Sequence, residues 1–464
     1  MNVHVQVQSP MISPLLALEI EALSMCLGGP VVTAGHADYD ALRGIACSSW
    51  DRCPLLLARV ADAADVADVV DFARRNQIEL AVRSGSFTVG GSIEGGVVVD
   101  LSDLNSLEID LAAMTVWAGS GLTAPEVARA LDKHGVTVPF GDAGSLGIAE
   151  MTLGGGAGYL TRKFGLTIDA LIGAEVVTAS GSILTVSQNS YPDLFWALRG
   201  GGNSFGIVTK FCYRLGPLPE FSGGALVLPA TAEVLSGFVA AAQAAPDELT
   251  AVLLAMPAPP LPFLPPEVAG STVLMGVIAY AGPEENADRA MAPFRALASP
   301  IADTMQPGPF NMMYMPDVSA VKPAHAVRTV HKDGLDTIQA AEIIRRLELA
   351  DAPMRMVQIR VLGGAVARVS RATTAYMHRD AGLAIEFLAM EGSEEAMARH
   401  DRWAGDFVAA LEGVGHDGPH VNFLAAQGQE MIHLSPPDPT SRRLQQIKQI
   451  YDPTNLFRRH PPVA

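Results

Sequence analysis

Residues 151–171 read MTLGGGAGYLTRKFGLTIDAL, and residues 193–211 read DLFWALRGGGNSFGIVTKF. In both stretches a cluster of glycines adjoins apolar residues, a pattern typical of turns in which the backbone passes close to a ligand or to another segment. A third glycine-rich turn, RSGSFT at residues 83–88, ends the strand-like run LAVR. Successive backbone amides in such a turn can hold a pyrophosphate, although one cluster alone is more often a simple tight turn. Two or three such turns together could cradle one dinucleotide.

The spacing of these glycines differs from the GxGxxG pattern of a Rossmann nucleotide site. Counted from Gly156 and Gly200, the third glycine position holds Thr161 and Phe205. A nicotinamide cofactor bound on a Rossmann turn is therefore not expected.

Short strands and helices alternate around the three turns up to about residue 215. The run DAADVADVVDFARRNQI at residues 62–78 has apolar residues at helical spacing and acidic residues near its start, which predicts a helix. From residue 216, proline-rich loops separate β-like runs, such as STVLMGVIAYA and LAIEFLAM, from helices, which predicts an antiparallel sheet backed by helices. We therefore predict an α+β fold with a first domain at residues 1–215, a second at 216–417, and a C-terminal segment at 418–464 that packs back onto the first.

The composition favours a compact globular protein with an acidic surface. Hydrophobic residues make up 49% of the 464 residues, charged residues 17%, and the formal net charge is -17. Such a surface repels phosphate backbones and anionic lipids, so neither nucleic acid nor a membrane is an expected partner.

The four cysteines form no CxxC pair, and the apolar N-terminal stretch carries Glu19 and Glu21 without a basic lead-in. We expect a cytoplasmic monomer or homodimer without a metal site, disulfide framework, signal peptide or membrane anchor.

The order of the motifs along the chain carries a family resemblance. AVRSGSFTVGG (81–91) and the two glycine-rich stretches quoted first resemble, in this order, the flavin-binding motifs of the vanillyl-alcohol oxidase superfamily with its PCMH-type domain, in the berberine bridge enzyme-like branch. The similarity continues through VQIRVLGGAVARV (357–369) and TTAYMHRD (373–380) and ends with VNFL and YDPTNLFR, so it covers nearly the whole chain. It implies a two-part PCMH-type FAD-binding domain, a substrate domain, and FAD bound at the boundary between them.

The resemblance also implies which residues hold the cofactor. Backbone groups of the first turn would bind the FAD pyrophosphate, and the later motifs would flank its pyrophosphate and adenine portions. The implied cofactor-binding residues are Arg83, Ser84, Gly85, Ser86, Phe87, Thr88, Gly141, Ala143, Ser145, Gly147, Gly154, Gly155, Gly158, Gly206, Ile207 and Asn422.

The sequence departs from the family at the positions that tether flavin. Members of this branch commonly carry a histidine in the first turn and a cysteine before the second motif, where this chain has Phe87 and Ala143. Neither side chain has a nucleophilic atom, so neither covalent bond can form, and FAD is expected to be held by contacts alone. The resemblance therefore implies a weaker oxidant, or a flavin whose redox role has lapsed.

The implied catalytic residues are His420, Tyr376, His378 and Asn422. His420 occupies the place of the family's usual tyrosine before Asn422, and its reference pKa of ~6.5 suits a general base at neutral pH. The alternative is a loop histidine without a catalytic part. Tyr376 and His378 would face the flavin from the substrate domain, or simply pack beneath it.

Two enzymatic functions remain open from the sequence, besides a redox-dead ligand-binding protein for which it offers no positive sign. The first is an FAD-dependent oxidase or dehydrogenase that acts on an apolar small molecule of secondary metabolism, with molecular oxygen as the acceptor. The alternative is a redox-neutral cyclase or isomerase in which FAD is structural or absent, which the joint changes at Phe87, Ala143 and His420 motivate.

Overall fold

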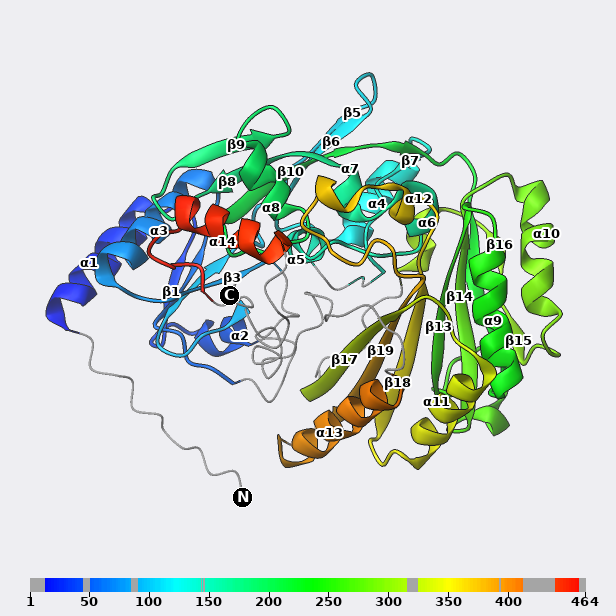
Figure 1. The fold of residues 1–464 in the computed structure, drawn as a ribbon. Helices are drawn as coiled ribbons and strands as arrows, with labels where there is room; N and C mark the ends of the chain where they lie inside the picture. Colours follow the sequence, from blue (N-terminus) through cyan, green and yellow to red (C-terminus); the bar gives the residue numbers. More distant parts are fainter. Residues whose placement is uncertain are drawn as a thin grey trace.

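The computed structural model describes residues 13–44, 51–84, 91–142, 144, 147–314, 324–391, 394–411 and 439–458. Three main sheets organise these residues, and the chain passes through them in sequence order (Figure 1). We call residues 13–217 together with helix α14 the first half, and residues 222–411 the second half. The mixture of helices with antiparallel sheets confirms the predicted α+β class, while the domain boundaries at residues 215 and 417 stay a prediction.

The first sheet has four strands in the order β1-β2-β4-β3, of which β2, β4 and β3 run parallel. Helix α3 confirms the predicted helix; the Asp62 side chain accepts hydrogen bonds from two backbone amides at its start, and Gln77 ends it in a left-handed conformation. A core of Val, Leu and Phe side chains joins α1 and α3 to the sheet. The elements are α1 (Pro14–Cys26), β1 (Val31–Thr33), α2 (Tyr39–Arg43), β2 (Leu56–Arg59), α3 (Ala63–Asn76), β3 (Leu80–Arg83) and β4 (Val97–Asp100).

The second sheet has five antiparallel strands in the order β5-β6-β10-β8-β9. Its strands and short helices share one buried core, which contains both glycine-rich stretches. The elements are β5 (Leu107–Asp110), β6 (Thr115–Gly119), α4 (Ala124–Asp132), β7 (Val136–Thr137), α5 (Ile148–Leu153), α6 (Thr161–Phe164), α7 (Thr167–Ala170), β8 (Leu171–Val177), β9 (Ile183–Ser187), α8 (Pro192–Leu198), β10 (Ile207–Arg214) and β11 (Gly216–Pro217), which pairs with β7.

The third sheet has eight antiparallel strands in the order β15-β12-β14-β13-β18-β19-β17, with β16 paired to β12. Four helices, α9, α10, α11 and α13, are packed with this half, and α14 returns to the first half (Figure 1). The strands are β12 (Ser222–Pro229), β13 (Leu249–Pro257), β14 (Thr272–Tyr280), β15 (Ala302–Asp303), β16 (Gln306–Pro307), β17 (Ala324–Lys332), β18 (Met354–Val361) and β19 (Leu383–Glu391). The helices are α9 (Ala232–Ala244), η2 (Pro266–Val268), α10 (Glu284–Arg295), η3 (Phe310–Met313), α11 (Thr337–Leu349), α12 (Ala365–Arg368), η4 (Arg371–Thr373), α13 (Glu394–Leu411) and α14 (Pro439–Tyr451).

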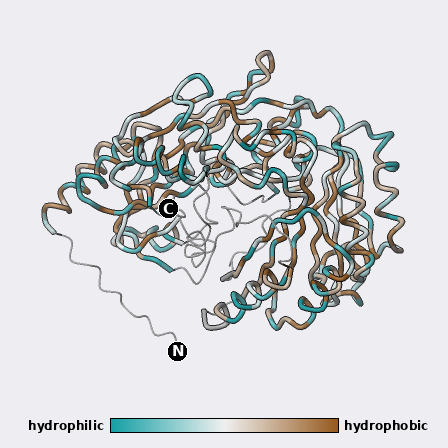
Figure 2. Tube along the Cα trace, in the orientation of Figure 1, coloured by the Kyte–Doolittle hydropathy of each residue, from teal (hydrophilic) through white to brown (hydrophobic). Residues whose placement is uncertain are grey.

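The two faces of this large sheet differ in chemistry. Side chains alternate along a strand, so residues that are paired across strands share a face. On the outer face Phe387 of β19 stacks on Phe407 of α13, with ring centroids 4.5 Å apart. On the inner face Thr329, Glu386 and Gln358 are paired in one row across β17, β19 and β18. In Figure 2 hydrophobic colour dominates the strands, whereas both colours alternate along the covering helices.

Helix α14 joins the C-terminal segment to the first half. The Lys448 ammonium donates to the carbonyl oxygen of Ser204 at 2.7 Å, and the Tyr451 hydroxyl donates to Asp193 at 2.9 Å. Among the described helices, none combines the length and the apolar character that a bilayer span requires.

Candidate functional site

More than half of the predicted site residues fall inside the described part of the chain. Those outside it are Gly85, Ser86, Phe87, Thr88, Ala143, Ser145, His420 and Asn422. Those inside it are Arg83, Ser84, Gly141, Gly147, Gly154, Gly155, Gly158, Gly206, Ile207, Tyr376 and His378.

Arg83 ends β3, where the first glycine-rich turn begins. Its guanidinium forms a buried ion pair with Asp100 at the end of the neighbouring strand β4, and it donates to the carbonyl oxygen of Leu42 at 2.7 Å. Burial works against ionisation of Asp100, but Arg83 and Ser102 outweigh it and lower the pKa of that carboxyl. The side chain of Arg83 thus joins the end of β3 to the end of β4 and to Leu42.

Ser84 and Gly147 lie in contact, although 62 residues separate them in the sequence. A Cβ atom added to Gly147 would come within 2.4 Å of the Ser84 hydroxyl oxygen, so only glycine allows this approach. Ser84 is 5% exposed, and among the described residues its hydroxyl has no hydrogen-bond partner. A buried hydroxyl of this kind fits a ligand rich in acceptor oxygens, such as a pyrophosphate.

The second and third glycine motifs meet at Tyr376. Gly155 and Gly200 have φ angles of 119° and 102°, which glycine tolerates best. A Cβ atom on Gly155 would lie 2.9 Å from the ring of Tyr376, and one on Gly200 would lie 2.7 Å from the Cβ atom of Tyr376. These two positions require glycine because the two motifs enclose Tyr376, which comes from the second half.

Other glycines of these motifs pack against the backbone. A Cβ atom on Gly158 would lie 2.0 Å from the carbonyl oxygen of Phe140, and one on Gly206 would lie 2.9 Å from that of Val177. Ile207 pairs with Val177 and is buried in the core of the first sheet. Packing within the chain explains these glycines without any ligand.

A polar cluster that was not predicted from the sequence lies between the halves; it contains the buried Arg360 and Glu386 and the partly buried Asp142 and Gln358. The Arg360 guanidinium donates to both carboxylate oxygens of Asp142 at 3.0 Å and forms an ion pair with Glu386. The Gln358 amide donates to Asp142 at 3.3 Å. One sequence signal was available: Gln358, Arg360 and Glu386 are polar residues at alternate or isolated positions in otherwise apolar strands.

The charges of this cluster do not balance, since two carboxylates face one guanidinium. Burial raises the pKa of the Glu386 carboxyl, and the Arg360 guanidinium offsets only part of that rise. Glu386 is 2% exposed. It can therefore hold a proton at a higher pH than an ordinary glutamate does.

A stack of rings lies beside this cluster. His331 of β17 and His378 are parallel, with ring centroids 3.8 Å apart and an interplanar angle of 2°. The ring of Tyr376 meets the ring of His378 edge-on, with centroids 5.8 Å apart. Burial raises the pKa of the Tyr376 phenol far above its usual range. The structure thus places Tyr376, His378 and His331 in one group of rings, while a role of Tyr376 and His378 at the flavin stays a prediction.

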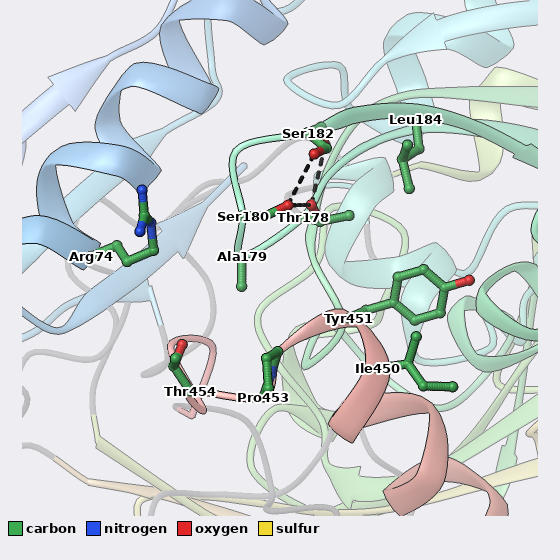
Figure 3. Close-up of a pocket in the computed structure, with 10 residues that line it drawn as sticks. All are labelled: Arg74, Thr178, Ala179, Ser180, Ser182, Leu184, Ile450, Tyr451, Pro453 and Thr454. Atoms are coloured by element: carbon green, nitrogen blue, oxygen red, sulfur yellow. Dashed lines mark hydrogen bonds between the residues drawn. The ribbon is translucent and has the colours of Figure 1, made fainter.

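A separate surface pocket of about 400 Å³ lies between α3, the β8–β9 turn and α14 (Figure 3). The hydroxyls of Thr178, Ser180 and Ser182 on its wall hydrogen-bond to one another at 2.9 and 3.0 Å. None of the predicted site residues lines it. Among the described residues, no group of three His, Cys, Asp or Glu side chains could hold a metal ion.

Comparison with known families gives two matches along the sequence. A family described as FAD binding domain matches residues 54–187, and one described as Berberine and berberine like matches residues 441–464. The FAD-linked oxidoreductase YgaK of Bacillus subtilis is 28% identical over 446 residues, which cover 93% of this chain and 96% of that protein. The (R)-6-hydroxynicotine oxidase of Paenarthrobacter nicotinovorans is 36% identical over 205 residues, or 43% of this chain and 44% of that protein.

Comparison with solved structures finds a similar fold over nearly the full length of this chain. The crystal structure of 6-hydroxy-D-nicotine oxidase from Arthrobacter nicotinovorans superimposes with a TM-score of 0.83 at 25% sequence identity. The superposition covers 94% of this chain and 98% of the oxidase.

Proposed function

Because the chain belongs to the berberine bridge enzyme-like FAD-linked oxidoreductases, we propose that it holds FAD without a covalent bond and oxidises a small molecule between its two halves. The observation that carries this proposal is the buried cluster of Asp142, Arg360 and Glu386. It joins the loop before the second glycine motif to the inner face of the large sheet. Ionisable groups at such a boundary are typical of a binding site.

The residues of the first half fit the cofactor. The buried Ser84 hydroxyl and its close approach to Gly147 suit a phosphate-bearing ligand, and Gly141, Gly154 and Ile207 belong to the same proposed cradle. When bound, FAD supplies the electron-accepting chemistry that amino acid side chains lack. Phe87 and Ala143 offer no atom for a covalent link, so we propose that contacts alone hold the cofactor.

Among the described residues, Glu386 is the best proton acceptor for the reaction. Burial raises its pKa above that of an ordinary glutamate, which strengthens it as a base, and Arg360 fixes its carboxylate in place. Tyr376 is less suitable, because burial makes its phenol hard to ionise. We also propose His378, His420 and Asn422 as members of the site.

The inner face of the large sheet supports a substrate that is mainly apolar with one polar group. Leu254 is paired with Gln358 and continues the row that contains Glu386, and Met356 is paired with Leu388 in the next row. These three apolar side chains are only partly buried, so they form an accessible wall beside the polar cluster. We further propose that the substrate belongs to secondary metabolism and that molecular oxygen is the final electron acceptor.

A visible absorption spectrum of the purified protein, followed by acid precipitation, tests the proposal. Yellow colour that is released to the supernatant supports FAD held without a covalent bond, whereas colour in the pellet contradicts it. Apolar candidate substrates are then added under argon. Bleaching that is lost in Glu386→Gln supports oxidation with Glu386 as the base, and conversion without bleaching favours the redox-neutral alternative.

A further inference from the structure

A segment of the second half, residues 371–379, crosses onto the third glycine motif. The backbone amide of Ala375 donates to the carbonyl oxygen of Arg199 at 3.0 Å, and the Arg199 guanidinium returns a bond to the carbonyl oxygen of Thr373 at 2.8 Å. The indole of Trp196 donates to the carbonyl oxygen of Ala372 at 2.9 Å. Three hydrogen bonds therefore hold this segment in register with α8 and the turn that follows it.

The same segment is tied to the second glycine motif by a buried ion pair. Arg379 is fully buried, and its guanidinium donates to both carboxylate oxygens of Asp169, at 3.0 and 2.6 Å. Asp169 also accepts a bond from the backbone amide of Leu166 at 2.9 Å, at the start of α7. A bidentate pair of this kind fixes orientation as well as distance.

Tyr376 fills the space between these two attachments. It is 4% exposed, and it packs in a small core with Leu166, Ile168 and Val366. Its ring faces Gly155 of the second motif, and its backbone and Cβ atom face Gly200 of the third. A single side chain from the second half therefore sets the separation of two glycine turns in the first half.

We propose that Tyr376 is a positioning residue for the cofactor, which acts by holding the second and third glycine motifs at the spacing that binds FAD. This inference rests on the proposed role of those motifs in the FAD cradle, and it extends that role to a residue outside all three motifs. Gly155 and Gly200 have positive φ angles and no side chains, so packing against Tyr376 supplements the backbone hydrogen bonds that Gly155 makes with Thr152 and Ile168. Loss of the ring leaves a cavity beside Gly155 into which the second motif can relax toward the third, whereas the Tyr376 backbone and Cβ atom beside Gly200 remain.

The geometry separates this role from that of a proton acceptor. The Tyr376 atoms nearest to the two glycines are ring carbons, the Cβ and Cα atoms and the backbone nitrogen, and the hydroxyl is not among them. Tyr376→Phe keeps every one of these atoms. A positioning role therefore predicts weaker FAD binding in Tyr376→Leu and normal FAD binding in Tyr376→Phe, whereas a proton acceptor would lose turnover in both variants with FAD retained.

The experiment measures the dissociation constant of FAD for apoprotein by fluorescence titration in four proteins. These are the wild type, Tyr376→Leu, Tyr376→Phe and the control Phe294→Leu, whose ring is buried in a core of the second half that excludes Tyr376. We expect Tyr376→Leu to weaken FAD binding about tenfold or more, equivalent to ~1.4 kcal/mol. Tyr376→Phe and Phe294→Leu should stay near the wild-type value, although Phe294→Leu should lower the thermal midpoint as much as Tyr376→Leu does.

Equal FAD affinity in Tyr376→Leu and Phe294→Leu would overturn the inference. If Tyr376→Leu does not fold, Tyr376→Met carries the same test, because methionine fills the cavity without a rigid ring. A wild-type protein that binds no FAD would overturn the proposed function and this inference together. If the wild type binds FAD and Tyr376→Leu or Tyr376→Met binds it equally well, this inference alone is overturned.

Discussion

Gly155 and Gly270 both have positive φ angles, of 119° and 80°, but their surroundings differ. A Cβ atom on Gly270 would meet no atom within 4 Å, whereas one on Gly155 would lie 2.9 Å from the Tyr376 ring. We therefore predict that Gly270→Ala costs only backbone strain, ~1–2 kcal/mol of unfolding free energy. Gly155→Ala should cost ~1–3 kcal/mol more, because the methyl group also overpacks the core.

Urea unfolding of the two variants measures this difference. The Gly270→Ala variant is the control, since it isolates the strain of a left-handed backbone from the contact with Tyr376. Equal losses of stability in both variants would mean that the Tyr376 ring moves aside freely, which contradicts a fixed position for it.

Glu386 makes the stability of the protein depend on pH. Because its pKa is raised in the folded state, the folded protein binds that proton more tightly than the unfolded chain does. Its favourable contribution is complete below the unfolded pKa of ~4.3 and is lost as pH rises through the folded pKa. We predict that Glu386→Gln, which cannot ionise, removes this fall in unfolding free energy with rising pH.

The measurement is urea unfolding of the wild type and of Glu386→Gln at a series of pH values on both sides of the unfolded glutamate pKa of ~4.3. Glu342→Gln is a contrasting control, since Arg345 and Arg346 lower the pKa of the partly exposed Glu342 to about 2. The pH dependence that Glu342 contributes to the unfolding free energy has the opposite sign to that of Glu386. The Glu342 carboxylate stabilises the protein above its unfolded pKa, and this contribution is lost as pH falls toward 2. If the unfolding free energies of the wild type and Glu386→Gln change with pH in parallel, the folded-state pKa of Glu386 is not raised and the prediction is wrong.

At the scale of elements, Arg360 connects strand β18 to strand β19 and to the loop at Asp142. Removal of this one guanidinium leaves two buried carboxylates without their partner. We predict that Arg360→Met lowers the unfolding free energy by ~3–5 kcal/mol, as is typical when one side of a buried ion pair is lost. Arg345→Met, on the exposed surface of α11, should be hard to distinguish from wild type by urea unfolding. A small effect in Arg360→Met would mean that both carboxyls become protonated at little cost.

The sequence predicted elements better than it predicted the contacts between them. Helical spacing in residues 62–78 gave α3, and the β-like run LAIEFLAM gave β19, because local periodicity records which face of an element is buried. The pairing of Asp142 with Arg360 joins residues 218 positions apart, and no local pattern encodes such a contact. Glycine clusters at Gly155 and Gly200 were recognised, but their contact with Tyr376 appears only in three dimensions.

At the scale of the whole molecule, polar contacts distributed along the boundary tie the halves together. Besides the pairs of Arg360 and Arg379, the Arg162 guanidinium donates to the carbonyl oxygens of Leu362 and Ala245, each at 2.8 Å. Lys163 donates to the carbonyl oxygen of Ala281. Because α6 supplies both donors and lies within the second glycine-rich stretch, the proposed FAD cradle and the large sheet share one set of contacts.

These contacts predict that FAD stabilises the entire protein and not the first half alone. A ligand that binds only the folded state stabilises it by ~2.7 kcal/mol at a free concentration ~100 times its dissociation constant. Calorimetry of apoprotein should therefore show one unfolding transition that moves as a whole to higher temperature when FAD is added. NAD is the control and should cause no shift, since the glycine spacing does not fit a Rossmann turn. Two transitions of which FAD moves only one would show that the contacts of Arg162, Arg360 and Arg379 are too weak to couple the halves.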